Sequence, residues 1–358
     1  MRRSVSAFSK IRPVNESADI PAMTDEARPS QRMPPTPWRR RLLRWEVFLA
    51  LVVAADFTLN VQLSPYFLST ETLADVSFKF TEKALVALPM TLLIIAGEID
   101  ISVAAIMALV SVCMGLLATT TASLSAIVGC GLAVGLLAGA FNGVLVTRWR
   151  VPAIVATIGT MSLYRGIAYG ILGDRVLKDY PPTFAFFGQG YIAGPVSFEL
   201  LLFTLAAVLC ALYLHRTEFG RRLVAIGCNK TAAEMAGVRV NRYRFGLFVA
   251  TGVASAAASV LLTSRLGSTR PSIAQGMELD IISMVILGGV AITGGRGSIA
   301  GVVLAAILTG LASFGLGLIN VPGVVMSLLM GALLILIVGL PIVGQRLSRA
   351  RARAQPRP

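Results

Sequence analysis

The sequence contains few charged residues, and it lacks the motifs of several classes of enzyme. Only 14% of the 358 residues are charged, whereas 55% are hydrophobic and the mean hydropathy is +0.76. None of the five lysines follows a glycine, so the chain has no G-x-x-x-x-G-K-[ST] loop for nucleotide phosphates. It also has no H-E-x-x-H zinc motif and no G-x-S-x-G nucleophile elbow. We therefore expect no ATP hydrolysis by this chain, no catalytic residues and no cofactor.

Histidine and cysteine are too scarce to suggest a metal centre or a disulfide framework. His215 is the only histidine, and a single histidine cannot supply a metal site. The four cysteines are Cys113, Cys130, Cys210 and Cys228. Their spacing fits neither a zinc site nor paired disulfides, so we expect them to pack as small apolar residues and expect no bound metal.

Long hydrophobic runs are what the chain has in abundance. In hydrocarbon the backbone must satisfy its own polar groups, so uncharged stretches of about 18 residues or more indicate membrane-spanning helices. The apolar segments fall at about 46–63, 81–97, 101–120, 124–147, 153–173, 196–214, 245–264, 280–293, 298–319 and 322–343. The sequence thus predicts an all-α integral membrane protein with about ten transmembrane helices.

Positive charge is concentrated in the two tails and in one set of loops. Of the 32 lysine and arginine residues, 25 lie in the tails or in the loops near 98–100, 148–152, 215–244 and 294–297. The positive-inside rule therefore predicts that both termini are cytoplasmic. It also accounts for the net charge of +14, so we do not expect nucleic-acid binding.

The charge pattern divides the chain into three parts. Residues 1–44 carry ten basic residues and several prolines but no apolar run of signal-peptide length, which predicts a flexible basic cytoplasmic tail. Met33 is an alternative start of translation, so part of this tail could be an artefact. Residues 45–343 form the predicted transmembrane domain, and residues 344–358 form a second basic cytoplasmic tail.

The longest polar connection, residues 215–244, contains signals for a short helix outside the membrane. Thr231 and Glu234 match a capping box, Asn229 is an alternative cap, and Gly237 suits the left-handed conformation that ends a helix. The helix would offer small apolar side chains to a soluble partner, within a basic surround: Ala232, Ala233, Met235 and Ala236, with Arg221, Arg222, Lys230 and Arg239 around them. An ordinary cytoplasmic connector would also be basic, and the spacing alone does not separate the two interpretations.

Several polar residues lie within or between the apolar segments. Glu98 and Asp100 would line a substrate path, bond to the backbone at a helix break, or lie in water at the cytoplasmic interface. Arg165 lies within the fifth segment, where it needs a polar partner or a water-filled cavity. Four uncharged groups could add hydrogen bonds along a path, although they also suit plain helix packing: Ser102, Asn142, Thr157 and Thr160.

Four motifs follow one another between residues 45 and 343. They are GEIDIS at 97–102; Asn142-Gly143, followed by Pro152 and IGTM at 158–161; FGR at 219–221, followed by Asn229, Ala232-Ala233 and Gly237; and Glu278-Leu279-Asp280, followed by Gly288-Gly289 and GGRG at 294–297. In this order they resemble the permease subunit of a bacterial sugar-importing ABC transporter of the ribose and simple-sugar branch. The chain departs from that pattern at Glu98, where the family usually has glycine.

The resemblance implies a permease of the bacterial inner membrane that works with several partners. These are a cytoplasmic ATP-binding subunit, a periplasmic sugar-binding protein and a second permease subunit, in a homodimer or a heterodimer. It also implies that residues 219–237 contain the coupling helix that docks on the ATP-binding subunit. The candidate coupling residues are Gly220, Arg221, Asn229, Ala232, Ala233, Glu234 and Gly237, and the candidate path residues are Glu98, Asp100, Ser102, Asn142, Thr157 and Thr160.

The transported solute is expected to be a neutral monosaccharide, because few charges lie deep in the apolar segments. Residues 263–271 and 320–323 are similar to rhamnose-type permeases, which makes rhamnose the first expectation and autoinducer-2, ribose and xylose the alternatives. The competing interpretations are an ion-coupled secondary carrier, which would need its own coupling ions and no docking helix, and a passive channel. A response of uptake to ATP and partner subunits would separate the importer from both.

Overall fold

The computed structural model describes residues 38–336 except 64–66, 121–122, 195, 324, 327, 330, 333 and 334. The predicted tail at 344–358, most of the tail at 1–44 and part of the apolar segment at 322–343 lie outside these residues. The described residues from Arg40 onward belong to one compact unit.

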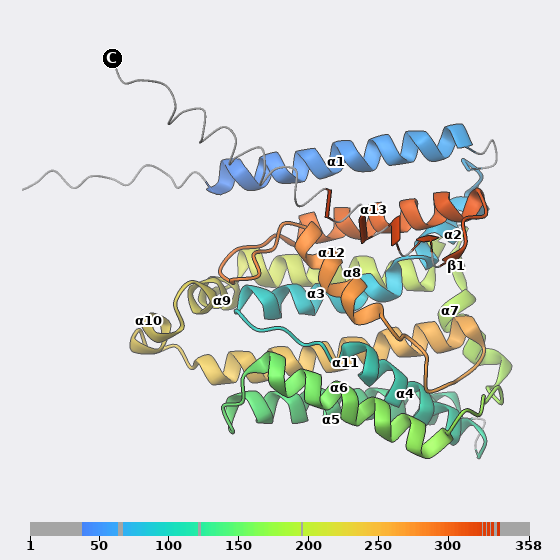
Figure 1. The fold of residues 1–358 in the computed structure, drawn as a ribbon, viewed down its shortest axis with the longest axis horizontal. Coiled ribbons are helices and arrows are strands. Elements are labelled where there is room, and N and C mark those ends of the chain that lie inside the picture. Colours follow the sequence, from blue (N-terminus) through green and yellow to red (C-terminus); the bar gives the residue numbers. More distant parts are fainter. Residues whose placement is uncertain are drawn as a thin grey trace, which may run out of the picture. The chain divides into compact units, whose positions relative to one another are not determined.

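Helices dominate this unit, as predicted (Figure 1). In chain order they are α1 (Trp38–Leu63), α2 (Thr70–Phe78), α3 (Thr81–Ile95), α4 (Val103–Ala118), α5 (Leu124–Thr147), α6 (Ala153–Leu172), the 3-10 helix η1 (Pro182–Ala185), α7 (Phe186–Gln189), α8 (Phe198–Arg216), α9 (Glu218–Cys228), α10 (Lys230–Met235), α11 (Val240–Leu266), α12 (Met277–Leu287) and α13 (Ile299–Leu318). The strands β1 (Tyr191–Ala193) and β2 (Val196–Ser197) pair antiparallel in a small hairpin.

Five of the described helices are long and apolar enough to cross a membrane: α1 from Trp45 onward, α5, α8, α11 and α13. The helix α4 is a shorter apolar helix, and α3 and α12 have 15 and 11 residues. At a rise of about 1.5 Å per residue, α3 and α12 are shorter than the hydrocarbon core of about 30 Å. Large apolar side chains are exposed on α1, α5 and α8, as contact with lipid requires. The count of ten spans remains a prediction.

The short helix α3 ends at an irregular segment, residues 96–102, before α4 begins. Gly97 takes a φ of +84°, and its N–H and that of Glu98 donate to the carbonyls of Ile94 and Leu93 at 2.9 and 3.1 Å. Asp100 is fully buried within this segment. Protein therefore covers part of the irregular backbone, which is the condition for a helix break at membrane depth.

Small residues let α5 and α11 pack closely. A Cβ atom added to Gly135 would lie 2.4 Å from the Cβ of Ala256, and one added to Gly139 would lie 2.5 Å from the carbonyl oxygen of Phe248. The predicted role of the glycines of α5 in close helix packing is therefore confirmed at these positions. The helix α11 also contacts α3 and α4, so it lies at the centre of the unit.

Candidate coupling site and buried polar residues

The predicted short helix in the loop 215–244 is present as α10, and a second helix, α9, precedes it. The side chain of Thr217 accepts a hydrogen bond from the N–H of Gly220 at the start of α9. The side chain of Asn229 accepts one from the N–H of Ala232 at 3.0 Å, so Asn229 caps α10. Thr231 lies inside α10, and the capping box with Glu234 is therefore wrong. Gly237 ends the helix with a φ of +82°, as predicted.

One of the four apolar side chains expected to face a partner, Ala233, is buried, whereas Ala232, Met235 and Ala236 are exposed. Ala233 is buried against Ile226 and Val240, so its side chain positions α10 on its own loop. The interpretation of Ala233 as a partner-facing residue is therefore wrong. Ala232, Glu234 and Met235 are exposed, and Met235 has 84% of its surface exposed. The basic residues Arg221, Arg222, Lys230 and Arg239 are also exposed, and Arg222 pairs with Glu218 at 2.9 Å.

The helix α9 contacts two other segments through its backbone. A Cβ atom on Gly227 would lie 1.9 Å from the carbonyl oxygen of Ile95 and 2.4 Å from the nitrogen of Gly295. The N–H of Gly295 in turn donates to that carbonyl of Ile95 at 2.8 Å. Gly220 allows a similarly close turn, since its Cβ would lie 1.8 Å from the carbonyl oxygen of Leu214. The end of α3, the turn at 294–297 and α9 thus meet at one point.

Glu98, the residue that departs from the family pattern, forms an ion pair with Arg244 of α11. The two side chains are 13% and 9% exposed. Glu98 is therefore largely covered by protein and paired, which does not match the interpretation that places it in water at the cytoplasmic interface. Its role in a path for the solute stays a prediction.

A polar cavity of about 720 Å³ lies beside this ion pair. Its walls come from the segment 96–102, from the loop between α5 and α6, from α10 and from the first turns of α11. The charged residues that line it are Glu98, Arg150, Lys230, Glu234 and Arg244. Candidate coupling and path residues therefore share one cavity.

Asp100, Ser102 and Asn142 come together in a buried network, which the sequence did not show. One carboxylate oxygen of Asp100 accepts from the N–H and the hydroxyl of Ser102 at 2.9 and 2.7 Å. The other accepts from the amide of Asn142 at 3.3 Å and from the hydroxyl of Thr251 at 3.4 Å. Tyr164 donates to the side-chain oxygen of Asn142 at 3.1 Å. Sequence reasoning missed Thr251 and Tyr164, whose side chains lie among apolar residues in the chain.

Thr157 and Thr160 are also buried, but their closest polar contacts are within their own helix. The hydroxyl of Thr157 donates to the carbonyl of Ala153 at 2.8 Å, and that of Thr160 donates to the carbonyl of Thr157 at 3.3 Å. Thr157 also approaches the carbonyl of Ile99 at 3.5 Å. These contacts match the packing interpretation of both residues.

The helix α11 carries further hydroxyl groups that bond to α4. Ser259 donates to the carbonyl of Met107 at 2.7 Å, and Thr263 donates to the hydroxyl of Ser111 at 2.8 Å. Together with Arg244 and Thr251, they form a row of polar contacts along α11, which we call the α11 seam. The repeated Ser and Thr residues of this apolar helix were the available signal in the sequence.

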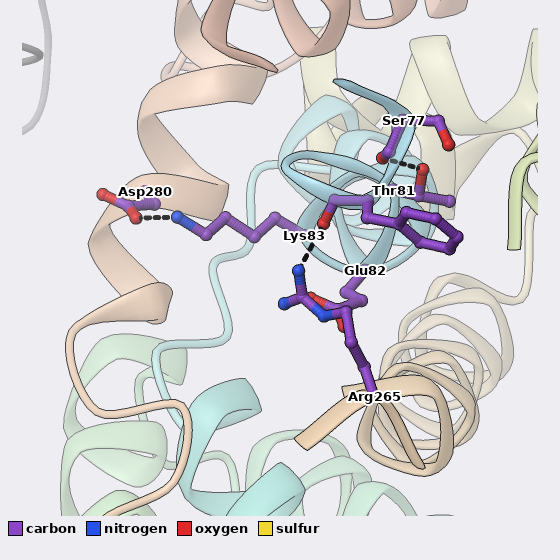
Figure 2. Close-up of polar contacts among 7 residues, drawn as sticks. Ser77, Thr81, Glu82, Lys83, Arg265 and Asp280 are labelled. Atoms are coloured by element: carbon purple, nitrogen blue, oxygen red, sulfur yellow. Dashed lines mark hydrogen bonds and ion pairs between the residues drawn. The ribbon is translucent and has the colours of Figure 1, made fainter. Parts of the chain in front are cut away.

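A second group of ion pairs lies at the other end of α11 (Figure 2). Arg265 reaches from α11 to Glu82 of α3 at 2.7 Å and donates to the carbonyl of Phe78 at 2.8 Å. On the other side of α3, Lys83 pairs with Asp280 of α12. Figure 1 places α10 at one end of the unit and α2 and α7 at the opposite end. The α11 seam joins α11 to the segment 96–102 and to α4, and Arg265 adds a contact with α3 at the end away from α10.

Arg165, the charged residue inside the fifth predicted span, has its polar partners in the backbone. Its guanidinium donates to the carbonyls of Pro271 and Ile273 at 2.7 and 2.8 Å and approaches that of Ala104 at 3.3 Å. It thereby holds the loop after α11 against α4 and α6. Within the described part of the chain, no three His, Cys, Asp or Glu residues are grouped closely enough to hold a metal ion.

Comparison with known proteins identifies the family. Residues 72–338 match the family described as the permease component of branched-chain amino acid transport systems. The autoinducer 2 import system permease protein LsrD of Klebsiella pneumoniae subsp. pneumoniae is 34% identical over 315 residues, which are 86% of this chain and 93% of that protein. LsrD of Photorhabdus laumondii subsp. laumondii is 34% identical over 310 residues (85% and 92%). LsrD of Salmonella typhimurium is 33% identical over 321 residues (88% and 95%).

No solved structure matches the chain at a significant level. The family match nevertheless covers most of the chain, and the relatives align along nearly their whole length. The chain therefore belongs to this family of ABC-transporter permeases, whose members are transport components, and it is a multi-pass protein of the bacterial inner membrane.

Proposed function

We propose that the chain forms the membrane path of an ATP-driven importer and that α10 docks on a separate ATP-binding subunit. One observation carries the proposal: α10 presents Met235 with 84% of its surface exposed, beside the exposed Lys230 and Arg239. An exposed methionine within a basic surround suits a site on another protein. Its neighbour α9 contacts the end of α3 through Gly227, so a force on this loop would reach the break at 96–102.

The proposed arrangement has both termini in the cytoplasm and uses about ten spans. A periplasmic binding protein would deliver the solute to the outer side, and a second permease subunit would complete the path. This assembly is the one that the family implies, and the basic loops support its orientation. The alternative class of transporter is an ion-coupled carrier, which would not need a docking surface on α10 because it works without an ATP-binding subunit.

We propose autoinducer 2 as the first candidate solute, in place of rhamnose. The support comes from the three relatives described above, which are named for autoinducer 2 import. Rhamnose rested on the similarity of residues 263–271 and 320–323 to rhamnose-type permeases, and none of these relatives supports it. Ribose, xylose and rhamnose remain alternatives, because specificity in such importers comes largely from the binding protein.

Deleting the gene is expected to abolish high-affinity uptake of labelled autoinducer 2, and the cloned gene should restore it. Uptake should depend on ATP and on the ATP-binding subunit. If autoinducer 2 uptake were undiminished and uptake of ribose, xylose or rhamnose were lost, the proposed solute would be wrong. The proposal of an ATP-driven importer would still hold. Uptake that follows a proton or sodium gradient and ignores ATP would overturn the proposed function.

Replacing Met235 with aspartate is expected to weaken copurification of the ATP-binding subunit by about tenfold or more, as loss of a central interface residue does. The permease itself should fold normally, because Met235 is exposed. Gly237→Val should weaken copurification as well, since a β-branched residue disfavours the φ of +82° that ends α10.

Val196→Asp is the matched control, because it places the same charge at an exposed apolar residue of the hairpin β1–β2. It should leave copurification unchanged. Equal copurification of the wild type, Met235→Asp and Gly237→Val would contradict docking through α10.

A further inference from the structure

The ion pair between Glu98 and Arg244 connects two segments that the proposed mechanism must move. Glu98 lies in the irregular segment between α3 and α4, directly after Gly97 with its φ of +84°. Arg244 lies near the start of α11, which follows α10 after a short connection. Both side chains are nearly buried. The ion pair therefore joins the end of α11 that is nearest to α10 to the break at 96–102.

The surroundings of the pair supply other partners for both charges. Lys230 and Glu234, four residues apart on α10, line the same cavity as Glu98 and Arg244. Arg150, from the loop between α5 and α6, is the remaining charged group of the lining. Lys230 carries the charge opposite to that of Glu98, and Glu234 the charge opposite to that of Arg244, so a shift of α10 toward this cavity would offer each an alternative partner. Each charge would then exchange one partner for another, which avoids leaving a buried charge unpaired.

We propose that Glu98 and Arg244 form a latch that holds the break at 96–102 against α11 and that opens when α10 moves on the ATP-binding subunit. The latch rests on the proposed coupling function and adds a positioning role for two residues of the cavity. Asp100 bonds to Thr251 on the same helix, seven residues beyond Arg244. If the ion pair between Glu98 and Arg244 opened, the hydrogen bond between Thr251 and Asp100 would still hold the segment 96–102 to α11. The latch would therefore release only the end of the segment at Glu98.

The test uses the complete transporter in lipid nanodiscs, with the ATP-binding subunit, the second permease subunit and the binding protein. ATP hydrolysis is measured with and without loaded binding protein, and solute transport is measured in proteoliposomes. Glu98→Gln and Arg244→Gln are expected to raise hydrolysis without loaded binding protein by about fivefold or more, in the range of ordinary allosteric coupling. The number of solute molecules transported for each ATP hydrolysed should fall. The exchanged pair Glu98→Arg with Arg244→Glu should restore both values toward the wild type.

Two further variants separate a latch from a purely structural ion pair. Glu98→Gly removes the charge at a residue that glycine can occupy in any conformation, so it remains informative if the glutamine variants fail to assemble. Lys230→Gln removes the proposed exchange partner and should lower the ratio of stimulated to unstimulated hydrolysis. Lys83→Gln, which breaks the ion pair with Asp280 at the other end, is the control and should change neither rate.

An unchanged ratio of stimulated to unstimulated hydrolysis in Glu98→Gly and Arg244→Gln would overturn the latch, and so would failure of the exchanged pair to restore the ratio. A lower thermal stability with the same ratio would assign the pair a structural role only. These outcomes differ from failure of the proposed function, which would appear in the wild type as transport that does not depend on ATP.

Discussion

Replacing Gly227 with alanine is expected to abolish ATP-driven uptake. The added methyl group would lie 1.9 Å from the carbonyl oxygen of Ile95 and 2.4 Å from the nitrogen of Gly295, so α9 would have to move away from both. Both neighbours are backbone atoms, which cannot turn aside as a flexible side chain can. Overpacking of this kind typically costs about 1–3 kcal/mol of folding free energy. The displacement also separates the docking loop from the break at 96–102, so transport should fall further than stability.

Gly246→Ala in α11 is the matched control for this variant. Apart from its chain neighbours and the backbone of its own helix, no atom of the described residues lies within 4 Å of a Cβ built on Gly246, where alanine should stabilise the helix by about 0.5–1 kcal/mol. Uptake in cells and thermal unfolding in detergent are measured for both variants. Wild-type uptake by Gly227→Ala at normal expression would show that the contact of α9 with Ile95 and Gly295 is not needed for coupling.

The features that could be predicted from the sequence are those set by neighbouring residues. Apolar length located the helices at most of the predicted segments, and Asn229 and Gly237 marked the two ends of α10 because capping acts within a single turn. The role of small residues in close packing also follows from composition, as the contact of Gly139 with α11 shows. Each of these signals acts over a few residues of the chain.

The features that could not be predicted depend on which helices pack together. The motif GEIDIS places Glu98 and Asp100 side by side, but nothing in it indicates that Arg244 binds the first and Thr251 the second. The inward orientation of Ala233 likewise depends on α10 folding back onto Ile226 and Val240. The choice between Asn229 and Thr231 as the cap was open in the sequence, because both residues can accept the required hydrogen bond.

The row of contacts along α11 gives the proposed coupling a physical route. A helix of 27 residues is about 40 Å long, so α11 alone reaches from the docking loop toward the opposite end of the unit. Thr251, Ser259 and Thr263 bond to Asp100 and to α4, and Arg265 bonds to Glu82 of α3. Because these contacts are directional, a rotation or shift of α11 would have to break or exchange several of them. They therefore favour a small number of discrete arrangements over continuous deformation.

Replacing Asp100 with alanine is expected to produce the largest loss of stability among single substitutions in the buried network. The carboxylate is fully buried and accepts hydrogen bonds from Ser102, Asn142 and Thr251. Alanine would leave the N–H and the hydroxyl of Ser102 without this acceptor, whereas Asn142 would keep its bond to the hydroxyl of Ser102 and Thr251 its bond to the carbonyl of Phe248. Each buried donor that loses its partner typically costs about 1–3 kcal/mol. We expect the free energy of unfolding to fall by at least about 3 kcal/mol in total.

Asp100→Asn removes the charge but keeps some of the hydrogen bonds, so it measures the two contributions separately. Its amide oxygen can still accept from the N–H and hydroxyl of Ser102, but its amide nitrogen would face the amide of Asn142, so an intermediate loss is expected. Thr160→Val is the control, because Thr160 is equally buried and bonds only weakly to the carbonyl of Thr157 in its own helix. Thermal unfolding of the purified permease in detergent should rank the variants Thr160→Val, Asp100→Asn and Asp100→Ala by increasing loss. If Asp100→Ala were as stable as Thr160→Val, the network around Asp100 would not hold the break to α11, and a role for Asp100 in contact with the solute would become the better interpretation.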